Sequence, residues 1–226
     1  MRIVLATHNP HKREELLHVL RGELKKWMTD HPQAIEILTL DDITQAIGDI
    51  EETGDTLEEN ALIKARAVYA QTHLPTIADD TGLEVSALGG APGVFSARYA
   101  GEGATYEDNV QKMLKALKDV NNRTVMFSTA IAFIDADGSE HVFRGSVEGT
   151  ITESPRGAHG FGYDPIFAPT EDAQGRTFAE MTDAEKNAIS HRGRALRKFA
   201  AYLLTQDNAC SEYRSGVEYF SFGKTH

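Results

Sequence analysis

Apolar and polar residues alternate along this chain with two different periods. Residues 3–6 form a short apolar run and residues 35–39 alternate apolar with polar positions, so both segments are expected to be strands. Residues 124–135 and 140–152 are expected to form a hairpin through the turn 135–138. Helical spacing of apolar residues, every three or four positions, is found in the segments 10–24, 56–72, 105–117 and from 190 onward, with a short helix expected at 182–186. The chain is therefore expected to mix helices and strands along most of its length.

The first strand leads through a short loop into the first helix. Asn9 is a favoured N-cap residue and Pro10 is favoured at the first helical position. Free backbone N–H groups and the positive end of the helix dipole would face this loop and could bind an anion. Lys12 adds a cation in the first turn, which makes most sense beside a bound anion. An ordinary cap with an exposed lysine explains the same residues, so the loop alone leaves both interpretations open.

Two adjacent carboxylates, Asp79 and Asp80, follow the apolar segment 75–78, and a second strand-like segment, 83–85, comes after Thr81-Gly82. The pattern places the two acids at the end of a strand. An unpaired buried charge is costly, whereas Mg²⁺ takes carboxylate oxygens and keeps several waters. The alternative is a solvated turn, because Asp, Thr and Gly all favour turns.

A glycine-rich segment, 157–165, carries Phe161, Tyr163 and Asp164 among three glycines. Aromatic side chains held in such a loop could stack on a planar ring, or they could simply cover the core. Further along, Lys186, Ser190, His191 and Arg192 form a polar, cationic group between two expected helices. Asn60 and Lys64 share one face of the 56–72 helix, which in isolation is typical of solvated surface.

The composition limits the kinds of partner that this chain can bind. The 226 residues carry a formal net charge of -11, so the chain has no general attraction to nucleic acid or to an anionic membrane. A single cysteine, Cys210, forms no disulfide within one chain and suits a reducing compartment. No signal peptide and no membrane-spanning run is apparent. We expect a cytoplasmic protein without nucleic-acid or membrane partners, whose polyanion binding, if any, relies on a local cation cluster or a metal.

Taken together, the loop with Lys12, the acids at Glu51, Asp79 and Asp80, the aromatic loop and the cations at 186–192 indicate a phosphorylated planar ligand and a divalent metal. At this point the sequence resembles the inosine triphosphate pyrophosphatases, also called XTP/dITP diphosphatases. The matching segments, within residues 2–204, are LATxNxxK at 5–12, EETG at 51–54, ENAxxKA at 59–65, ADDTGL at 78–83, LGGAPGV at 88–94, SARYAG at 96–101, GFGYDPIF at 160–167 and EKNAISHRG at 185–193.

The resemblance implies a fold, a reaction and a cofactor. The fold would be α/β, an elongated mixed sheet flanked by helices in two lobes around a central nucleotide cleft. Residues 1–206 would form this one domain, and 207–226 would be a C-terminal tail of no assigned role. The reaction would be hydrolysis of ITP, dITP or XTP to the monophosphate and pyrophosphate, cleansing the nucleotide pool, with Mg²⁺ and usually in a homodimer.

The resemblance also implies roles for individual residues. Asp80 would be the general base, and Glu51 with Asp80 would hold the metal, supported by Asp79. Contacts to the phosphates would come from Thr7, His8, Asn9, Pro10, His11, Lys12, Asn60 and Lys64, and Thr81 would also contact the substrate. Phe161, Gly162, Tyr163 and Asp164 would stack on and orient the base, and Lys186, His191 and Arg192 would read its 6-oxo edge. Donors at that edge accept hypoxanthine or xanthine and leave adenine's amino group unpaired.

Two features depart from the family pattern, and two other functions compete. His8-Asn9-Pro10-His11 replaces a loop that is usually Gly-Asn followed by small residues, and the tail beyond 207 lies outside the pattern. A Maf-like pyrophosphatase acting on modified pyrimidine nucleotides is disfavoured by the segments 160–164 and 190–192. A non-catalytic nucleotide sensor is disfavoured by the intact carboxylates, since a sensor has little use for a group that activates water.

Overall fold

The computed structural model describes residues 1–30, 35–44 and 47–215. Its centre is one mixed sheet of seven strands, in the order β2-β1-β3-β5-β6-β7, with β4 paired to β3. The strands are β1 (Arg2–Leu5), β2 (Glu36–Thr39), β3 (Thr76–Val85), β4 (Pro92–Gly93), β5 (Thr124–Ile134), β6 (Glu140–Ile151) and β7 (Phe167–Pro169). β1 runs parallel to β2 and β3, and the remaining pairs are antiparallel.

Helices cover both faces of this sheet. They are α1 (Pro10–Asp30), α2 (Leu57–Thr72), α3 (Tyr106–Ala116), α4 (Asp183–Ile189) and α5 (His191–Ser215), with 3-10 turns at Leu40–Asp42, Ser86–Leu88, Ser96–Arg98 and Phe178–Glu180. α1 and α5 pack on one face around Ile77 and Phe133, and α2 packs on the other around Ala78 and Ala132. Because side chains alternate across a strand, consecutive residues of β3 belong to different cores.

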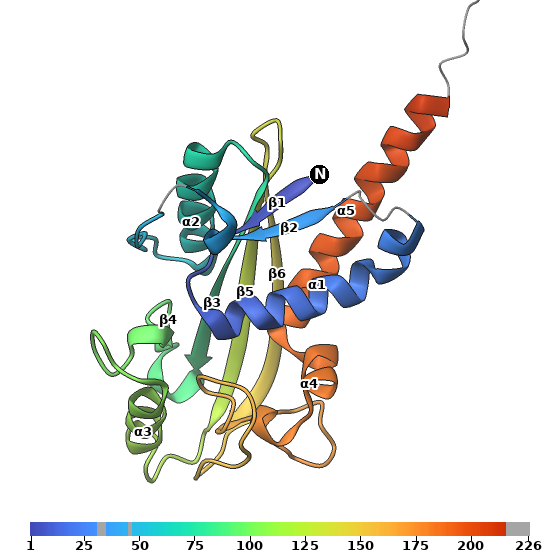
Figure 1. Cartoon of the computed structure of the whole chain (residues 1–226). Coiled ribbons are helices and arrows are strands. Elements are labelled where there is room, and N and C mark those ends of the chain that lie inside the picture. The colour runs from blue at the N-terminus through green and yellow to red at the C-terminus, as the bar shows by residue number, and fades with distance from the viewer. Residues whose placement is uncertain (31–34, 45–46, 216–226) are drawn as a thin grey trace, which may run out of the picture.

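The long strands β3, β5 and β6 continue past these helices into a second lobe (Figure 1). There the strand ends, α3 and the segment before β7 enclose a third core that includes Leu83, Val110, Phe127 and Tyr163. The prediction of a mixed sheet flanked by helices in two lobes is confirmed.

Local sequence signals account for several boundaries. Asn9 Oδ1 accepts the backbone N–H groups of His11 (3.0 Å) and Lys12 (3.2 Å), so the predicted N-cap of α1 is confirmed. Thr56 and Glu59 form the predicted capping box of α2. The hairpin of β5 and β6 is also confirmed.

One prediction about β3 is wrong. The sequence placed Asp79 and Asp80 at a strand end or in a turn, but β3 runs unbroken through them to Val85. The reason is pairing at a distance, because β5 matches β3 residue by residue from Thr76 to Val85. Gly82 allows a further strand to approach, since a Cβ there would lie 2.8 Å from the Gly93 carbonyl oxygen.

The C-terminal helix extends further than the pattern predicted. α5 continues to Ser215, past residue 207, where the apolar periodicity decays. The rest of the expected tail, 216–226, lies outside the described residues. Within the described part of the chain, none of the helices combines the length and apolar character needed to cross a membrane.

Candidate active site

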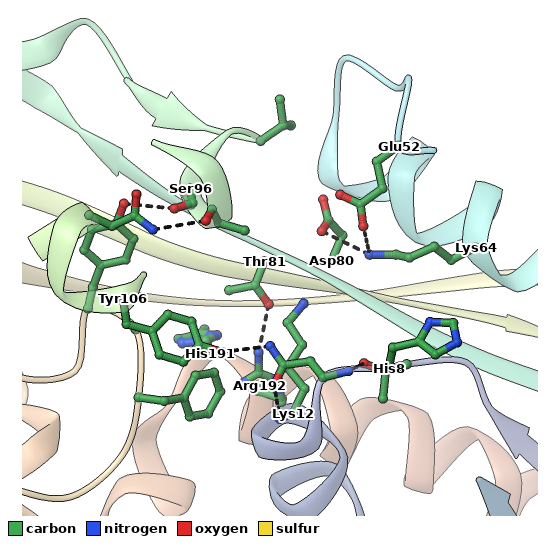
Figure 2. Close-up of a pocket in the computed structure, with 18 of the residues that line it drawn as sticks. His8, Lys12, Glu52, Lys64, Asp80, Thr81, Ser96, Tyr106, His191 and Arg192 are labelled. Carbon is green, nitrogen blue, oxygen red and sulfur yellow. Dashed lines mark hydrogen bonds and ion pairs between the residues drawn. The ribbon is translucent and has the colours of Figure 1, made fainter. Parts of the chain in front are cut away.

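A cavity of about 400 Å³ lies where the two lobes meet. Most of the residues predicted from the sequence line it, namely Thr7, His8, Asn9, Lys12, Lys64, Asp80, Thr81, Phe161, Gly162, Tyr163, Asp164, Lys186, His191 and Arg192. Figure 2 shows Lys12 from α1, Lys64 from α2, Asp80 and Thr81 from β3 and Arg192 from α5 brought close together. The sequence therefore located the cavity, although its lining residues come from segments as far apart as Ala6 and Arg192.

The first turn of α1 places Lys12 in the cavity lining. Its Nζ lies 3.2 Å from Asp79 Oδ2, and its side chain is only 19% exposed, which excludes the reading of an exposed surface lysine. Burial, together with the nearby cations Lys64 and Arg192, lowers the pKa of Lys12. Part of the anion-binding capacity of the helix start is used by the Asn9 cap, so Lys12 carries much of the positive charge here.

Asp80 faces α2 and meets a second lysine. Lys64 Nζ lies 3.2 Å from Asp80 Oδ1 and 2.5 Å from Glu52 Oε1, so one ammonium group joins two carboxylates (Figure 2). Asp80 Oδ2 is buried and has no hydrogen-bond partner. Burial raises the pKa of Asp80 although Lys64 and Lys12 oppose the shift. A carboxylate with an unused oxygen and a raised pKa suits a group that accepts a proton.

The predicted metal ligand Glu51 lies away from the cavity, and its neighbour Glu52 faces it. Glu51 is exposed and does not line the cavity, whereas Glu52 lines it and faces Lys64 and Asp80. Segment 51–54 forms neither helix nor strand, and its successive side chains face different directions. The two adjacent glutamates looked equivalent in the sequence, because no local pattern indicated which of them faces the cavity.

Asp79 lies on the opposite face of β3, under α1 and α5. Arg192 contacts its Oδ2 with Nε (3.3 Å) and Nη2 (3.2 Å), and Lys12 contacts the same oxygen. Lys12, Arg192 and Lys64 hold the pKa of Asp79 well below its usual range even though burial opposes this. Asp79 therefore stays ionised and anchors two cations, and it does not line the cavity.

Glu15 belongs to the same charge network and was missed by sequence reasoning. Its carboxylate contacts Arg192 Nη1 (2.5 Å) and Lys186 Nζ (3.3 Å). These cations hold the pKa of Glu15 low against the effect of burial. The available signal was its position three residues after Lys12, which places both side chains on one side of α1.

The glycine-rich loop forms another part of the cavity lining. Asp164 Oδ2 accepts hydrogen bonds from Lys186 Nζ (2.8 Å) and from the backbone N–H of Phe161 (2.8 Å). Gly160 has a φ of 73°, and a Cβ there would collide with the Asp164 carboxylate. Lys186 Nζ lies 5.1 Å from the Phe161 ring centre. The loop thus holds one aromatic face beside a buried cation.

Tyr163 fits both interpretations of the aromatic residues in this loop, covering the core and facing a ligand. It packs in the core of the second lobe, and its hydroxyl donates to the Ser96 carbonyl oxygen at 2.9 Å. It nevertheless lines the cavity. Phe161 is less buried, so its ring is the more accessible of the two.

His191 and Arg192 begin α5, which packs closely on β6. Gly145 makes this approach possible, because a Cβ there would collide with the His191 carbonyl oxygen. Arg192 is bonded to Glu15, Asp79 and Thr81, so most of its guanidinium is committed to protein partners. Burial, with Arg192 and Lys186 nearby, lowers the pKa of His191 well below 6.5. The imidazole is therefore neutral at pH 7.

Three further residues that were predicted to contact the substrate lie outside the cavity lining. Pro10, His11 and Asn60 do not line the cavity. Asn60 is fully buried, and its Oδ1 accepts the Gly54 N–H at 2.8 Å, which shapes the loop that carries Glu52. His11 instead stacks on Phe161, with ring centres 5.4 Å apart and an interplanar angle of 18°. Pro10 only begins α1.

The oxygen atoms of the cavity indicate which kind of metal ion could bind there. Within the described residues, no three His, Cys, Asp or Glu side chains converge as a metal cage. Glu52 and Asp80 supply two carboxylates bridged by a cation, with one Asp80 oxygen unused. Such a set suits an ion of the Mg²⁺ type, which completes its shell with water and substrate oxygens.

Fold and cavity together define an α/β protein with a cleft for a phosphorylated, planar ligand. A family model described as the Ham1 family matches residues 3–202, and the chain belongs to this family. Among its curated relatives are a dITP/XTP pyrophosphatase from Thermoanaerobacter sp. (strain X514), 48% identical over 90% of this chain and 97% of that protein, and one from Porphyromonas gingivalis, 47% identical over 90% and 97%.

Solved structures agree with the family assignment. A HAM1 protein from Coxiella burnetii superposes with a TM-score of 0.78, at 41% identity, over 91% of this chain and 99% of that one. The Ham1 protein of Staphylococcus aureus superposes with a TM-score of 0.76, at 35% identity, over 91% and 100%.

Proposed function

We propose that this chain hydrolyses the non-standard purine nucleoside triphosphates dITP, XTP and ITP to the nucleoside monophosphate and pyrophosphate. The observation that carries the proposal is that one cavity is lined by two kinds of group. Asp80, Lys12 and Lys64 supply acid–base and cationic groups, and Phe161 with Lys186 supplies an aromatic ring and a hydrogen-bond donor. A nucleotide has matching parts, and the relatives named above are called dITP/XTP pyrophosphatases.

Asp80 would accept the proton of the attacking water. The water oxygen forms a bond to the α-phosphorus while the bond from that phosphorus to the bridging α,β oxygen breaks, and pyrophosphate leaves with that oxygen. Lys12 and Lys64 neutralise phosphate charge, and such positioning and neutralisation account for most of phosphoryl-transfer catalysis. A magnesium ion held by Glu52 and Asp80 would polarise the phosphoryl oxygens and acidify water.

Phe161 and Lys186 would select the purine base. Phe161 offers a ring for stacking, and Asp164 fixes the backbone N–H of Phe161 and the ammonium group of Lys186. Lys186 has only donors, and adenine's 6-amino group cannot accept from them. A 6-oxo purine can, and a site built for such a hydrogen bond discriminates strongly because the wrong base leaves a buried donor unpaired.

The resemblance to the inosine triphosphate pyrophosphatases also supports an assembly and a location. We propose a cytoplasmic homodimer that uses no nucleic-acid or membrane partner. Light scattering coupled to size exclusion tests the homodimer, and a single-chain mass across the accessible concentration range would contradict it.

The test of the function is a panel of ITP, dITP, XTP, GTP, ATP and dTTP with Mg²⁺, assayed separately for pyrophosphate and orthophosphate. The 6-oxo purine substrates should give pyrophosphate in equimolar amount with the monophosphate. Orthophosphate with the diphosphate would place the attack on another phosphorus. Preference for modified pyrimidine substrates would favour a Maf-like activity, and tight binding without product would indicate a sensor.

A further inference from the structure

A chain of hydroxyl groups connects the charge network to His191. Thr81 on β3 and Thr129 on β5 are cross-strand partners, and their Oγ1 atoms lie 2.8 Å apart. Thr129 Oγ1 lies 2.6 Å from His191 Nδ1. Thr129 is completely buried and His191 is 2% exposed, so no solvent competes for these bonds. The nitrogen facing the sheet is therefore Nδ1, and Nε2 is the one left for the cavity.

The direction of the hydrogen bonds in this chain is set at its other end. Thr81 Oγ1 accepts from Arg192 Nη2 at 3.0 Å, so its own proton must go elsewhere. Two acceptors compete for the Thr81 proton. Asp79 Oδ2 lies 3.3 Å from Thr81 Oγ1, but it already accepts from Lys12 and from two Arg192 nitrogens. Thr129 Oγ1, at 2.8 Å, has the usual distance for an O–H···O bond. The Thr81 proton therefore points to Thr129.

The remaining steps follow from the number of protons each group carries. Thr129 accepts from Thr81 and has one proton of its own, which it donates to His191 Nδ1. A neutral imidazole has one N–H, so Nδ1 is an acceptor and the proton resides on Nε2. Burial and the neighbouring cations keep this imidazole neutral by lowering its pKa. Within the described residues, Nε2 makes no hydrogen bond to the protein, so its N–H is free for a ligand in the cavity.

We propose that the relay Arg192–Thr81–Thr129 fixes His191 as the tautomer that donates from Nε2, and that Thr129 is thereby a specificity-determining positioning residue for 6-oxo purines. This inference rests on the proposed function. In the opposite tautomer, Nε2 would accept, which would favour the amino group of adenine over the carbonyl oxygen of hypoxanthine. The relay thus makes base choice depend on a residue that does not line the cavity.

Two measurements test the relay. The first is ¹⁵N NMR of the wild-type imidazoles at neutral pH, with His191 assigned by the loss of its signals in His191→Gln. The expected pattern is a bare Nδ1 and a protonated Nε2. The second is the ratio of kcat/KM for ITP to kcat/KM for ATP. In Thr129→Val this ratio should fall by about three- to tenfold, the worth of one neutral hydrogen bond, while Thr129→Ser should keep it.

The matched control is Ser128→Ala, the next residue on β5, whose hydroxyl is also buried and bonds Ser146 Oγ at 2.9 Å. Its ratio and its His191 spectrum should equal those of the wild type. A protonated Nδ1 in the wild type, or an unchanged ratio in Thr129→Val, overturns the relay. Failure of the wild type to release pyrophosphate from ITP would instead overturn the proposed function, and the NMR result does not depend on activity.

Discussion

Asp79 and Asp80 are neighbours on one strand, yet they sit in opposite electrostatic environments. Asp79 points to the α1 and α5 face and contacts Arg192 and Lys12, and its pKa is held far below the ordinary range. Asp80 points to the α2 face, contacts Lys64, keeps one oxygen unpaired and has a raised pKa. Because side chains alternate across a β-strand, the structural carboxylate and the proposed general base are adjacent residues on opposite faces.

The largest effect is expected when Asp80 is changed. Asp80→Asn keeps the shape and removes the proton acceptor, so turnover of ITP should fall by about two to four powers of ten. Lys12 and Lys64 remain, and ITP affinity measured by calorimetry should stay within about tenfold of the wild type. Glu84→Gln, an exposed acid on the same strand, is the control and should be fully active. Turnover within about tenfold of the wild type would exclude Asp80 as the base.

Asp79 should show its effect in stability. Asp79→Asn leaves Arg192 and Lys12 without their shared buried anion, and breaking a buried pair costs about 3–5 kcal/mol. Because the folded pKa lies below 3.8, this stability is present above pH 3.8 and is lost as pH falls through the folded pKa. Urea unfolding at pH 7 measures the loss. Asp41→Asn, which breaks an exposed pair with Arg13, should cost only about 0–1 kcal/mol. Equal losses in the two variants would contradict the assignment.

Glu52 and Glu51 offer a second pair of neighbours. Glu52→Gln removes a charge beside Asp80, so the Mg²⁺ concentration that gives half-maximal ITP hydrolysis should rise by about tenfold or more. Glu51→Gln changes an exposed side chain of the same size and should leave this concentration unchanged. The reverse order would restore the assignment that the sequence suggested.

The smallest effect concerns pH and His191. The pKa of His191 in the folded protein lies well below 6.5. Below pH 6.5 the imidazole therefore binds a proton in the unfolded chain but stays neutral in the folded protein. Stability is therefore lost as pH falls below 6.5, by up to about 1.4 kcal/mol per pH unit from this residue. The difference in unfolding free energy between wild type and His191→Gln should shrink from pH 7.5 to pH 5.5. A constant difference would mean that His191 titrates normally.

The sequence predicted those features of the fold that depend on residues close together in the chain. The caps at Asn9 and Thr56 set helix starts, and the turn 135–138 set the hairpin, because these depend on neighbours in the chain. The uninterrupted course of β3 could not be predicted, since it requires β5 to pair across Asp79 and Asp80. Glu15 was missed for a similar reason, because its partners Lys186 and Arg192 lie on distant helices.

The most direct measurement of the contrast between the two carboxylates is a ¹³C NMR titration of the side-chain carboxyl groups in the metal-free protein, with assignments from Asp79→Asn and Asp80→Asn. We predict that the Asp79 carboxylate stays ionised down to the lowest pH at which the protein is folded. The Asp80 signal should titrate above the ordinary value of 3.8. If Asp79 takes up its proton at a higher pH than Asp80, the division of labour on β3 is contradicted.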